Sequence, residues 1–260
     1  MDRPQLLEAL ARVSVPDELL ECVPEMPIDL SGLLLYGSRA RGDAVSGSDL
    51  DLLAVVERPR PSIHSGDVSV SYYTMEQVES GRGTLFGAHL KRDAKVLWDP
   101  SHKVGMALSR MGDVDTERLF SRAKNMSRIL GSLEMDLPKY LIGLLREARY
   151  LLRSCMYARA IADGNPCFSV RELALRNADP RLATLLSSRQ EIEPSFEELT
   201  ECISRLKAIL GPLPNNSHGS LEALIVNEWL TGGDLLSMAF MALGNTGNDS
   251  DYAEVDKILL

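Results

Sequence analysis

Apolar residues in the first hundred positions follow two spacings, one typical of helices and one typical of strands. Residues 3–13 carry leucines and a valine at helical spacing, and a second short apolar segment covers residues 19–23. The apolar run at residues 32–36 stops at a Gly-Ser pair, and the run at residues 50–56 stops shortly before an Arg-Pro pair. These two runs predict buried strands that end in sharp turns.

Three further segments extend this pattern. Residues 68–73 read Val-Ser-Val-Ser-Tyr-Tyr, which predicts a strand with one polar face. Residues 75–92 have helical spacing, with glycines at positions 81 and 83 as the candidate break, and residues 95–98 predict a fourth strand before an Asp-Pro pair. Helices and strands therefore mix in the first part of the chain.

Strand patterns stop after about residue 114, and helical spacing takes over. Residues 116–130 and a longer segment up to Gly164 each present one apolar face. Helix-start signals in this half are Asp136 with Pro138, Ser169 with Glu172, Asp179 with Pro180, and Ser195 with Glu198. We expect an α/β (α+β) domain over residues 1–114 and an all-α helical-bundle domain over residues 115–260. The polar stretch 244–251 predicts mobile last residues.

The charge balance narrows the range of partners. The chain of 260 residues is 45% hydrophobic and 25% charged, as in ordinary globular proteins, and its formal net charge is -9. A sequence-independent grip on nucleic acid needs a basic surface, so a nucleic acid substrate is disfavoured. An acidic surface is easier to reconcile with a cationic small molecule or a protein.

Cysteine usage and the N-terminus indicate the compartment. The four cysteines are scattered without a Cys-x-x-Cys pair, and there are only four histidines, so a structural zinc site is not expected. Free and mostly buried thiols are typical of the reducing cytoplasm. The first ten residues show no signal-peptide pattern, and the apolar runs are shorter than the roughly 20 residues that span a bilayer. We expect a cytoplasmic protein without a membrane segment.

The stretch from residue 33 to residue 56, LLLYGSRARGDAVSGSDLDLLAVV, contains the candidate chemistry. Gly37 lets the first strand turn tightly, and Ser38 stands at the expected start of a helix, where free N–H groups and a hydroxyl favour bound phosphate. Arg39 and Arg41 add positive charge nearby. The sequence therefore predicts a phosphate-binding turn directly after a buried strand.

A pair of carboxylates begins the second strand. Strand side chains alternate in direction, so Asp49 and Asp51 share one face, whereas Leu50, Leu52 and Ala54 point to the other. Two adjacent carboxylates repel each other, and a hard cation such as Mg²⁺ would relieve the repulsion and also bind nucleotide phosphates. This combination of turn and carboxylates is typical of phosphoryl-group chemistry.

The motif resembles the signature of the DNA polymerase β-like nucleotidyltransferase superfamily. That signature reads Gly-Ser, ten residues and Asp-x-Asp, which correspond here to Gly37-Ser38, residues 39–48 and Asp49-Leu50-Asp51. The surrounding letters GSRARG, SD and DLL are similar to its minimal-nucleotidyltransferase branch. The resemblance implies a small mixed sheet flanked by helices, with two Mg²⁺ on Asp49 and Asp51. It also implies a nucleotide-binding set of Gly37, Ser38, Arg39, Arg41 and Ser48.

Families of this kind usually carry a third carboxylate on a neighbouring strand, which shares a metal and can deprotonate the acceptor. Asp67 is the candidate for this metal-binding and catalytic role, but shifting the alignment by two residues puts Ser69 in its place. Because positions 67 and 69 share a face of the strand, the alternation of side chains cannot separate them.

The resemblance continues to residues 88–100, which are similar to the end of the nucleotidyltransferase domain in aminoglycoside adenylyltransferases. A helical second domain that closes the cleft is also their plan. In the helical half, Arg146, Arg149 and Arg153 lie at helical spacing and could meet a triphosphate or form a solvated flank. His89 could act near the site or simply pack.

We therefore expect an adenylyltransferase-like enzyme that moves a nucleoside monophosphate, AMP from ATP or the equivalent part of another NTP, to a small-molecule or protein acceptor and releases pyrophosphate. The alternative is a nucleotide-binding regulatory or interaction module, of toxin–antitoxin or phage-defence type, with little turnover. Oligomeric state and acceptor identity do not follow from the sequence.

Overall fold

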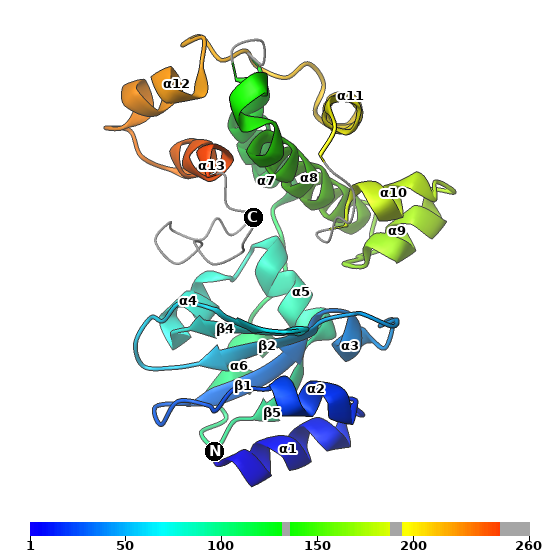
Figure 1. The fold of residues 1–260 in the computed structure, drawn as a ribbon, viewed down its shortest axis with the longest axis vertical. Helices are drawn as coiled ribbons and strands as arrows, with labels where there is room; N and C mark the ends of the chain where they lie inside the picture. The colour runs from blue at the N-terminus through cyan, green and yellow to red at the C-terminus, as the bar shows by residue number, and fades with distance from the viewer. Residues whose placement is uncertain (132–135, 188–193, 245–260) are drawn as a thin grey trace. The chain divides into compact units, whose positions relative to one another are not determined.

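The computed structural model describes residues 1–131, 136–187 and 194–244, and these form two compact units. The first unit runs from Met1 to Val114 and the second begins at Asp115 (Figure 1). Apart from Gly244, the stretch 244–251 lies outside the described residues.

A mixed five-stranded sheet forms the centre of the first unit, in the order β3-β4-β2-β1-β5. Strands β2 and β4 run parallel, whereas the β1–β2, β1–β5 and β3–β4 pairs are antiparallel. The strands are β1 (Gly32–Tyr36), β2 (Leu50–Val55), β3 (Ile63–Ser65), β4 (Val68–Tyr73) and β5 (Lys95–Trp98). The small mixed sheet confirms the expected fold class. Only β3 was not predicted, because its three residues show no alternation of apolar side chains.

Six helices of the described part of this unit surround the sheet: α1 (Arg3–Arg12), α2 (Asp17–Cys22), α3 (Gly37–Arg41), α4 (Met75–Ser80), α5 (Leu85–Asp93) and α6 (Lys103–Ser109). The predicted break near Gly81 separates α4 from α5, and Thr84 begins α5 because its side chain accepts the N–H of Gly87. Helix α6 was not predicted. It begins after His102 without a side-chain cap, so the usual start signal is missing.

The two faces of the sheet belong to two hydrophobic cores (Figure 1). On one face, β2 residues Leu50, Leu52 and Ala54 pack in the cluster that includes α1 and α2. On the other face, Leu53 and Val55 join the cluster that includes α4, α5 and α6. Because side chains alternate along a strand, Asp51 shares the second face.

The second unit contains only helices among its described residues, as predicted. They are α7 (Thr116–Met126), the 3-10 helix η1 (Ser127–Leu130), α8 (Leu137–Ala162), α9 (Val170–Arg176), α10 (Arg181–Leu185), α11 (Phe196–Leu210), α12 (Leu221–Glu228) and α13 (Asp234–Leu243). Helix α8 lies at the centre, packed by α7, α11 and α13. The side chains of Ser169 and Ser195 accept the N–H groups of Glu172 and Glu198, which confirms both predicted helix starts.

Asp136 begins α8 but stabilises another helix. Its side chain makes no cap hydrogen bond to α8. Instead, the two carboxylate oxygens accept the N–H of Leu221, at 3.1 and 3.2 Å. Asp136 therefore joins the first residue of α12 to the start of α8 across a long sequence separation.

The four cysteines are free, and Cys155, Cys167 and Cys202 are buried, as expected. Across the described ranges, no helix combines the length and apolar character needed to cross a bilayer.

Candidate active site

The turn after β1 lies close to the carboxylate of Asp51. Gly37 has a φ of +74°, which favours glycine, and a Cβ added there would lie 2.3 Å from Oδ2 of Asp51. Any other residue would therefore displace this carboxylate. Ser38 follows in α3, and its carbonyl oxygen accepts the N–H groups of Gly42 and Asp43 at 2.9 and 3.1 Å. The Gly-Ser turn and the Asp-x-Asp motif thus meet, as the motif predicts.

The two aspartates of the motif lie at the beginning of β2 and are half-buried. Asp51 is the second residue of the strand, opposite Tyr36 of β1 on one side and Ser69 of β4 on the other. Asp49 precedes the strand by one residue, whereas the sequence predicted that the strand includes it.

The negative charge of Asp51 affects its neighbour Tyr36. Burial raises the pKa of the Tyr36 phenol, and the charge of Asp51 raises it further, while a hydrogen bond with Ser71 acts in the opposite direction. Tyr36 therefore stays protonated beside the carboxylate. The part of the pKa shift that comes from Asp51 reflects its negative charge, which repels further negative charge at this end of the sheet.

The register between β2 and β4 separates the two candidates for the third position. Ser69 pairs with Asp51, so the hydroxyl-bearing residue is the immediate neighbour of that carboxylate. Asp67 lies in the turn before β4, and its carbonyl oxygen accepts the N–H of Leu50 at 2.7 Å. Continuing the register by one residue sets Asp67 beside Asp49. Both candidates are thus close to the motif, each next to a different aspartate.

The donors suit a hard cation in type but do not form a complete cage. Carboxylate oxygens are ligands that Mg²⁺ prefers, and Mg²⁺ commonly takes one or two carboxylates together with substrate phosphates. Within the described ranges, no group of three His, Cys, Asp or Glu side chains is arranged to hold a metal ion. Asp49 and Asp51 fit as two carboxylate ligands, with the remaining positions left to water and phosphate.

Arg39 points to the main chain of the loop before β2. Its Nε donates to the carbonyl oxygens of Ser48 at 3.2 Å and Asp49 at 3.1 Å, and its Nη2 donates to that of Ser48 at 2.7 Å. Ser48 in turn closes the loop, because its Oγ accepts the N–H of Val45 at 2.8 Å. Arg39 and Ser48, two members of the predicted nucleotide-binding set, therefore hold the loop that carries Asp49.

Arg41 belongs to a cluster between α3 and α5. Its Nη1 lies 3.2 Å from Nε2 of His89 and 3.6 Å from Oδ2 of Asp93, and its Nε lies 3.2 Å from Oδ1 of Asp43. Burial raises the pKa of Asp93, and the nearby arginines act in the opposite direction. His89 also contacts the Tyr36 ring edge-on, with centroids 6.2 Å apart. His89 is thus a packed residue that links this cluster to Tyr36.

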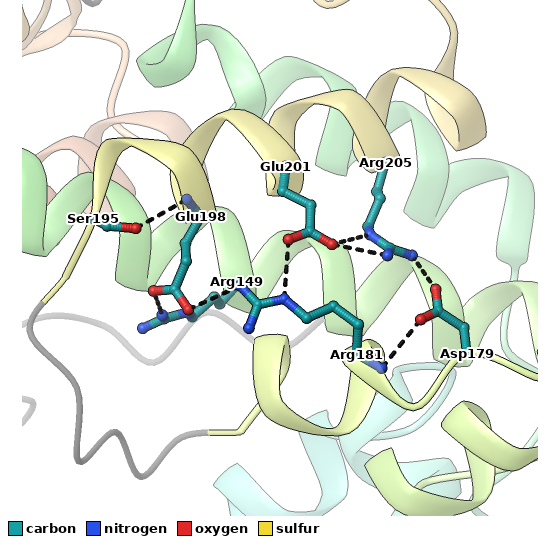
Figure 2. A network of polar contacts seen from close by, with 7 residues as sticks. All are labelled: Arg149, Asp179, Arg181, Ser195, Glu198, Glu201 and Arg205. Atoms are coloured by element: carbon teal, nitrogen blue, oxygen red, sulfur yellow. Dashed lines mark hydrogen bonds and ion pairs between the residues drawn. The ribbon is translucent and has the colours of Figure 1, made fainter.

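The arginine row of the helical half is engaged within its own unit. Arg146 binds Glu147 and the carbonyl oxygen of Met241, and Arg149 forms an ion pair with Glu198 at 2.7 Å (Figure 2). The Arg149 side chain is only 11% exposed, so at this position the row is not a solvated flank. Sequence spacing could not reveal Glu198 and Met241 as partners, because they belong to α11 and α13, whereas Glu147 is the neighbour of Arg146 in α8.

Tyr36 and Ser69 are the strand neighbours of Asp51; the sequence offered Ser69 as an alternative for the third position but did not single out Tyr36. They flank Asp51 only because β1 and β4 both pair with β2. The polar alternation of residues 68–73 is the one signal that pointed to a polar face at this place.

Comparison with known proteins finds a family model that matches part of the chain. The model of the family described as nucleotidyltransferase domain matches residues 17–99, which include both aspartates and the Gly-Ser turn. No curated protein matches the chain.

Two solved structures are similar to the chain with low TM-scores and low sequence identity. One, described as a toxin–antitoxin with AMP-PNP, has 13% identity and a TM-score of 0.25, and the match covers 42% of this chain and 82% of that chain. The other is a nucleotidyltransferase-like protein from Exiguobacterium sibiricum, with 13% identity and a TM-score of 0.31, covering 78% of this chain and 75% of that chain.

Proposed function

We propose that residues 17–99, which match the nucleotidyltransferase domain family, belong to the DNA polymerase β-like superfamily, and that the chain transfers a nucleoside monophosphate, AMP from ATP, to an acceptor with release of pyrophosphate. The observation that carries the proposal is the contact between the Gly37 turn and the Asp51 carboxylate. It joins the phosphate-binding element and the acidic element in one place. In this proposal the transfer chemistry belongs to residues 1–114, and the described helices from Asp115 onward belong to a separate domain.

Each residue of the motif has a proposed role. Asp49 and Asp51 hold Mg²⁺, with two ions expected. Gly37 and Ser38 bind the β- and γ-phosphates through the turn. Bound Mg²⁺ supplies charge stabilisation for the attacking and leaving oxygens of a phosphoryl transfer. Asp67, beside Asp49, takes the proton of the acceptor hydroxyl.

The acceptor is a small molecule or a protein side chain. The net charge of -9 supports a cationic acceptor over a nucleic acid, because an acidic surface attracts cations and repels a phosphate backbone.

A second candidate function is a nucleotide-binding regulatory module with little turnover. The specific observation in its favour is the register that pairs Ser69, not an acidic residue, with Asp51. A site with only two carboxylates could bind a metal–nucleotide complex and lack a base beside Asp51.

Label transfer tests the proposal. The purified protein is incubated with Mg²⁺ and α-labelled ATP or GTP, together with small-molecule, RNA and protein fractions of a host lysate. Label is expected in the small-molecule or protein fraction, and it should fall by about a thousandfold in Asp49→Asn and Asp51→Asn, because the metal contributes several kcal/mol. Asp17→Asn is the matched control, since Asp17 is an exposed aspartate of α2 in the same unit.

Each outcome decides between the candidates. Full transfer in both Asp49→Asn and Asp51→Asn would show that the site assignment is wrong. Mg²⁺-dependent ATP binding in calorimetry, without transfer to any fraction, would establish the regulatory module instead.

A further inference from the structure

The loop that leads into β2 is held by one side chain from α3. The guanidinium of Arg39 makes three contacts of 3.2 Å or less with the carbonyl oxygens of Ser48 and Asp49. Arg39 is half-buried, and its donors face the main chain of the loop. A guanidinium suits this task because its donors form a rigid planar fork that can reach two acceptors together.

These contacts fix the two peptide planes on either side of Asp49. The carbonyl of Ser48 belongs to the peptide before Asp49, and the carbonyl of Asp49 belongs to the peptide after it. The peptide between Asp49 and Leu50 is also held at its N–H, which donates to the main-chain carbonyl oxygen of Asp67 at 2.7 Å. When both flanking planes are held, φ and ψ of Asp49 are restricted, and so is the direction of its Cα–Cβ bond.

The loop also contains glycines, whose backbone is less restricted than that of other residues. Gly42 and Gly47 both have positive φ values and place no Cβ against the structure, so the loop contains two flexible positions. The Ser48 hydroxyl accepts the N–H of Val45, and the N–H of Ser48 donates to the Val45 carbonyl oxygen at 2.9 Å, so both bonds close the turn before Asp49. Asp49 also precedes the first residue of β2, so the ladder of the sheet does not include it.

We propose that Arg39 is a positioning residue that aims the Asp49 carboxylate at the metal, and that it acts through the main chain rather than by binding the nucleotide phosphates. The inference rests on the proposed function, because it gives Asp49 a metal to bind. It separates Arg39 from Gly37 and Ser38, which contact the phosphates directly in that proposal.

Mn²⁺ affinity of the nucleotide-free protein is the first test, measured by titration of the free-ion paramagnetic resonance signal. Arg39→Ala should weaken Mn²⁺ binding about 10- to 100-fold, as removal of groups that orient metal ligands does. Arg39→Lys should weaken it nearly as much, because a single ammonium keeps the charge but cannot bridge two carbonyl oxygens. Arg12→Ala is the matched control, since the Arg12 side chain is 73% exposed in the same unit.

Kinetics and rescue give the second test. Both Arg39 variants should lower kcat while KM for ATP stays within about twofold, and ethylguanidinium should restore activity to Arg39→Ala but not to Asp49→Asn. Thermal melting of each variant confirms that it is folded, and Arg39→Lys with the rescue keeps the test valid if Arg39→Ala unfolds. Wild-type Mn²⁺ affinity in Arg39→Lys, with a raised KM for ATP in Arg39→Ala, would overturn the inference in favour of direct nucleotide binding.

Failure of the inference and failure of the proposed function are distinguishable. If the wild-type protein binds Mn²⁺ and transfers label while both Arg39 variants behave like it, only the role of Arg39 is wrong. If the wild-type protein neither binds Mn²⁺ nor transfers label, the proposed function falls and the inference falls with it.

Discussion

The arginines along α11 and Arg39 in the first unit have different kinds of partner. In the helical unit, they neutralise carboxylates in a network along α11, made of Arg149, Asp179, Arg181, Glu198, Glu201 and Arg205, with Ser195 at the start of the helix (Figure 2). In the nucleotidyltransferase unit, Arg39 beside the motif binds carbonyl oxygens instead. The first arrangement uses charge to join helices, and the second uses hydrogen bonds to hold a loop.

Acidic residues in the two places also differ in what balances their charge. Glu198 is 7% exposed and lies between two guanidiniums, Arg149 and Arg181, so its charge is compensated within the fold. Under the proposed function, the charges of Asp49 and Asp51 are compensated by a cation that arrives with the nucleotide. Substitutions in the two places should therefore affect different measurements.

The largest expected effect on stability is that of Arg149→Met. It leaves Glu198 buried with only Arg181, whose side chain is 44% exposed, so the free energy of unfolding should fall by about 3 kcal/mol. Urea unfolding measures the loss. Arg12→Met is the control, because the Arg12–Glu8 pair is exposed and should contribute less than about 1 kcal/mol. Equal losses in both variants would show that the network does not stabilise the helical unit.

Gly37→Ala should act on activity. The added Cβ would lie 2.3 Å from the Asp51 carboxylate, so the carboxylate would have to move away. A displacement of about 1 Å can lower the rate about a hundredfold. Gly42→Ala is the matched control, since its φ of +82° gives similar backbone strain but no atom lies within 4 Å of the new Cβ. Transfer rates and melting temperatures of both variants separate the strain from the displaced carboxylate. A rate for Gly37→Ala equal to that of Gly42→Ala would contradict the role of the contact.

Two substitutions can show whether Asp67 acts as the third carboxylate beside the motif. Asp67→Asn should lower the transfer rate about a hundredfold if Asp67 takes the acceptor proton. Ser69→Asp, which places a carboxylate beside Asp51, should restore part of the rate in the Asp67→Asn background. An unchanged rate in Asp67→Asn would remove Asp67 from the mechanism.

The smallest expected effect concerns pH and the start of α12. Hydrogen bonds from the backbone and from Tyr140, followed by that from Lys139, lower the pKa of Glu222 from 4.5 to about 2. A lowered pKa stabilises the folded state above pH 4.5, and this contribution is lost as the pH falls toward about 2. Because the Glu222 side chain is 43% exposed, screening by solvent limits the contribution to less than about 1 kcal/mol.

Unfolding of Glu222→Gln and the wild type between pH 2 and 7 checks this expectation. The difference in free energy of unfolding should be constant above about pH 5 and vanish near pH 2. A difference that persists unchanged at low pH would show that the carboxylate charge is not its cause.

Much of the secondary structure could be predicted because its signals are local. Apolar runs marked β1, β2, β4 and β5, and serine caps marked α9 and α11. In the first unit, the elements that were not predicted, β3 and α6, lack those signals: β3 has three residues, and α6 begins without a side-chain cap. Both depend on packing against neighbours to form.

By itself, the sequence located the motif between two apolar strands, whereas the shared face of Asp49 and Asp51 stays a prediction, because Asp49 precedes β2. Gly-Ser, ten residues and Asp-x-Asp between two apolar runs predict a turn and a shared face, because both follow from local backbone geometry. Only the tertiary structure decided that Ser69 is the neighbour of Asp51 and that Arg39 holds the loop of Asp49. Strand alternation is identical for positions 67 and 69, so local spacing cannot tell which of them lies beside Asp51. The partner of the Arg39 side chain depends on how separate segments pack, so local spacing cannot predict it either.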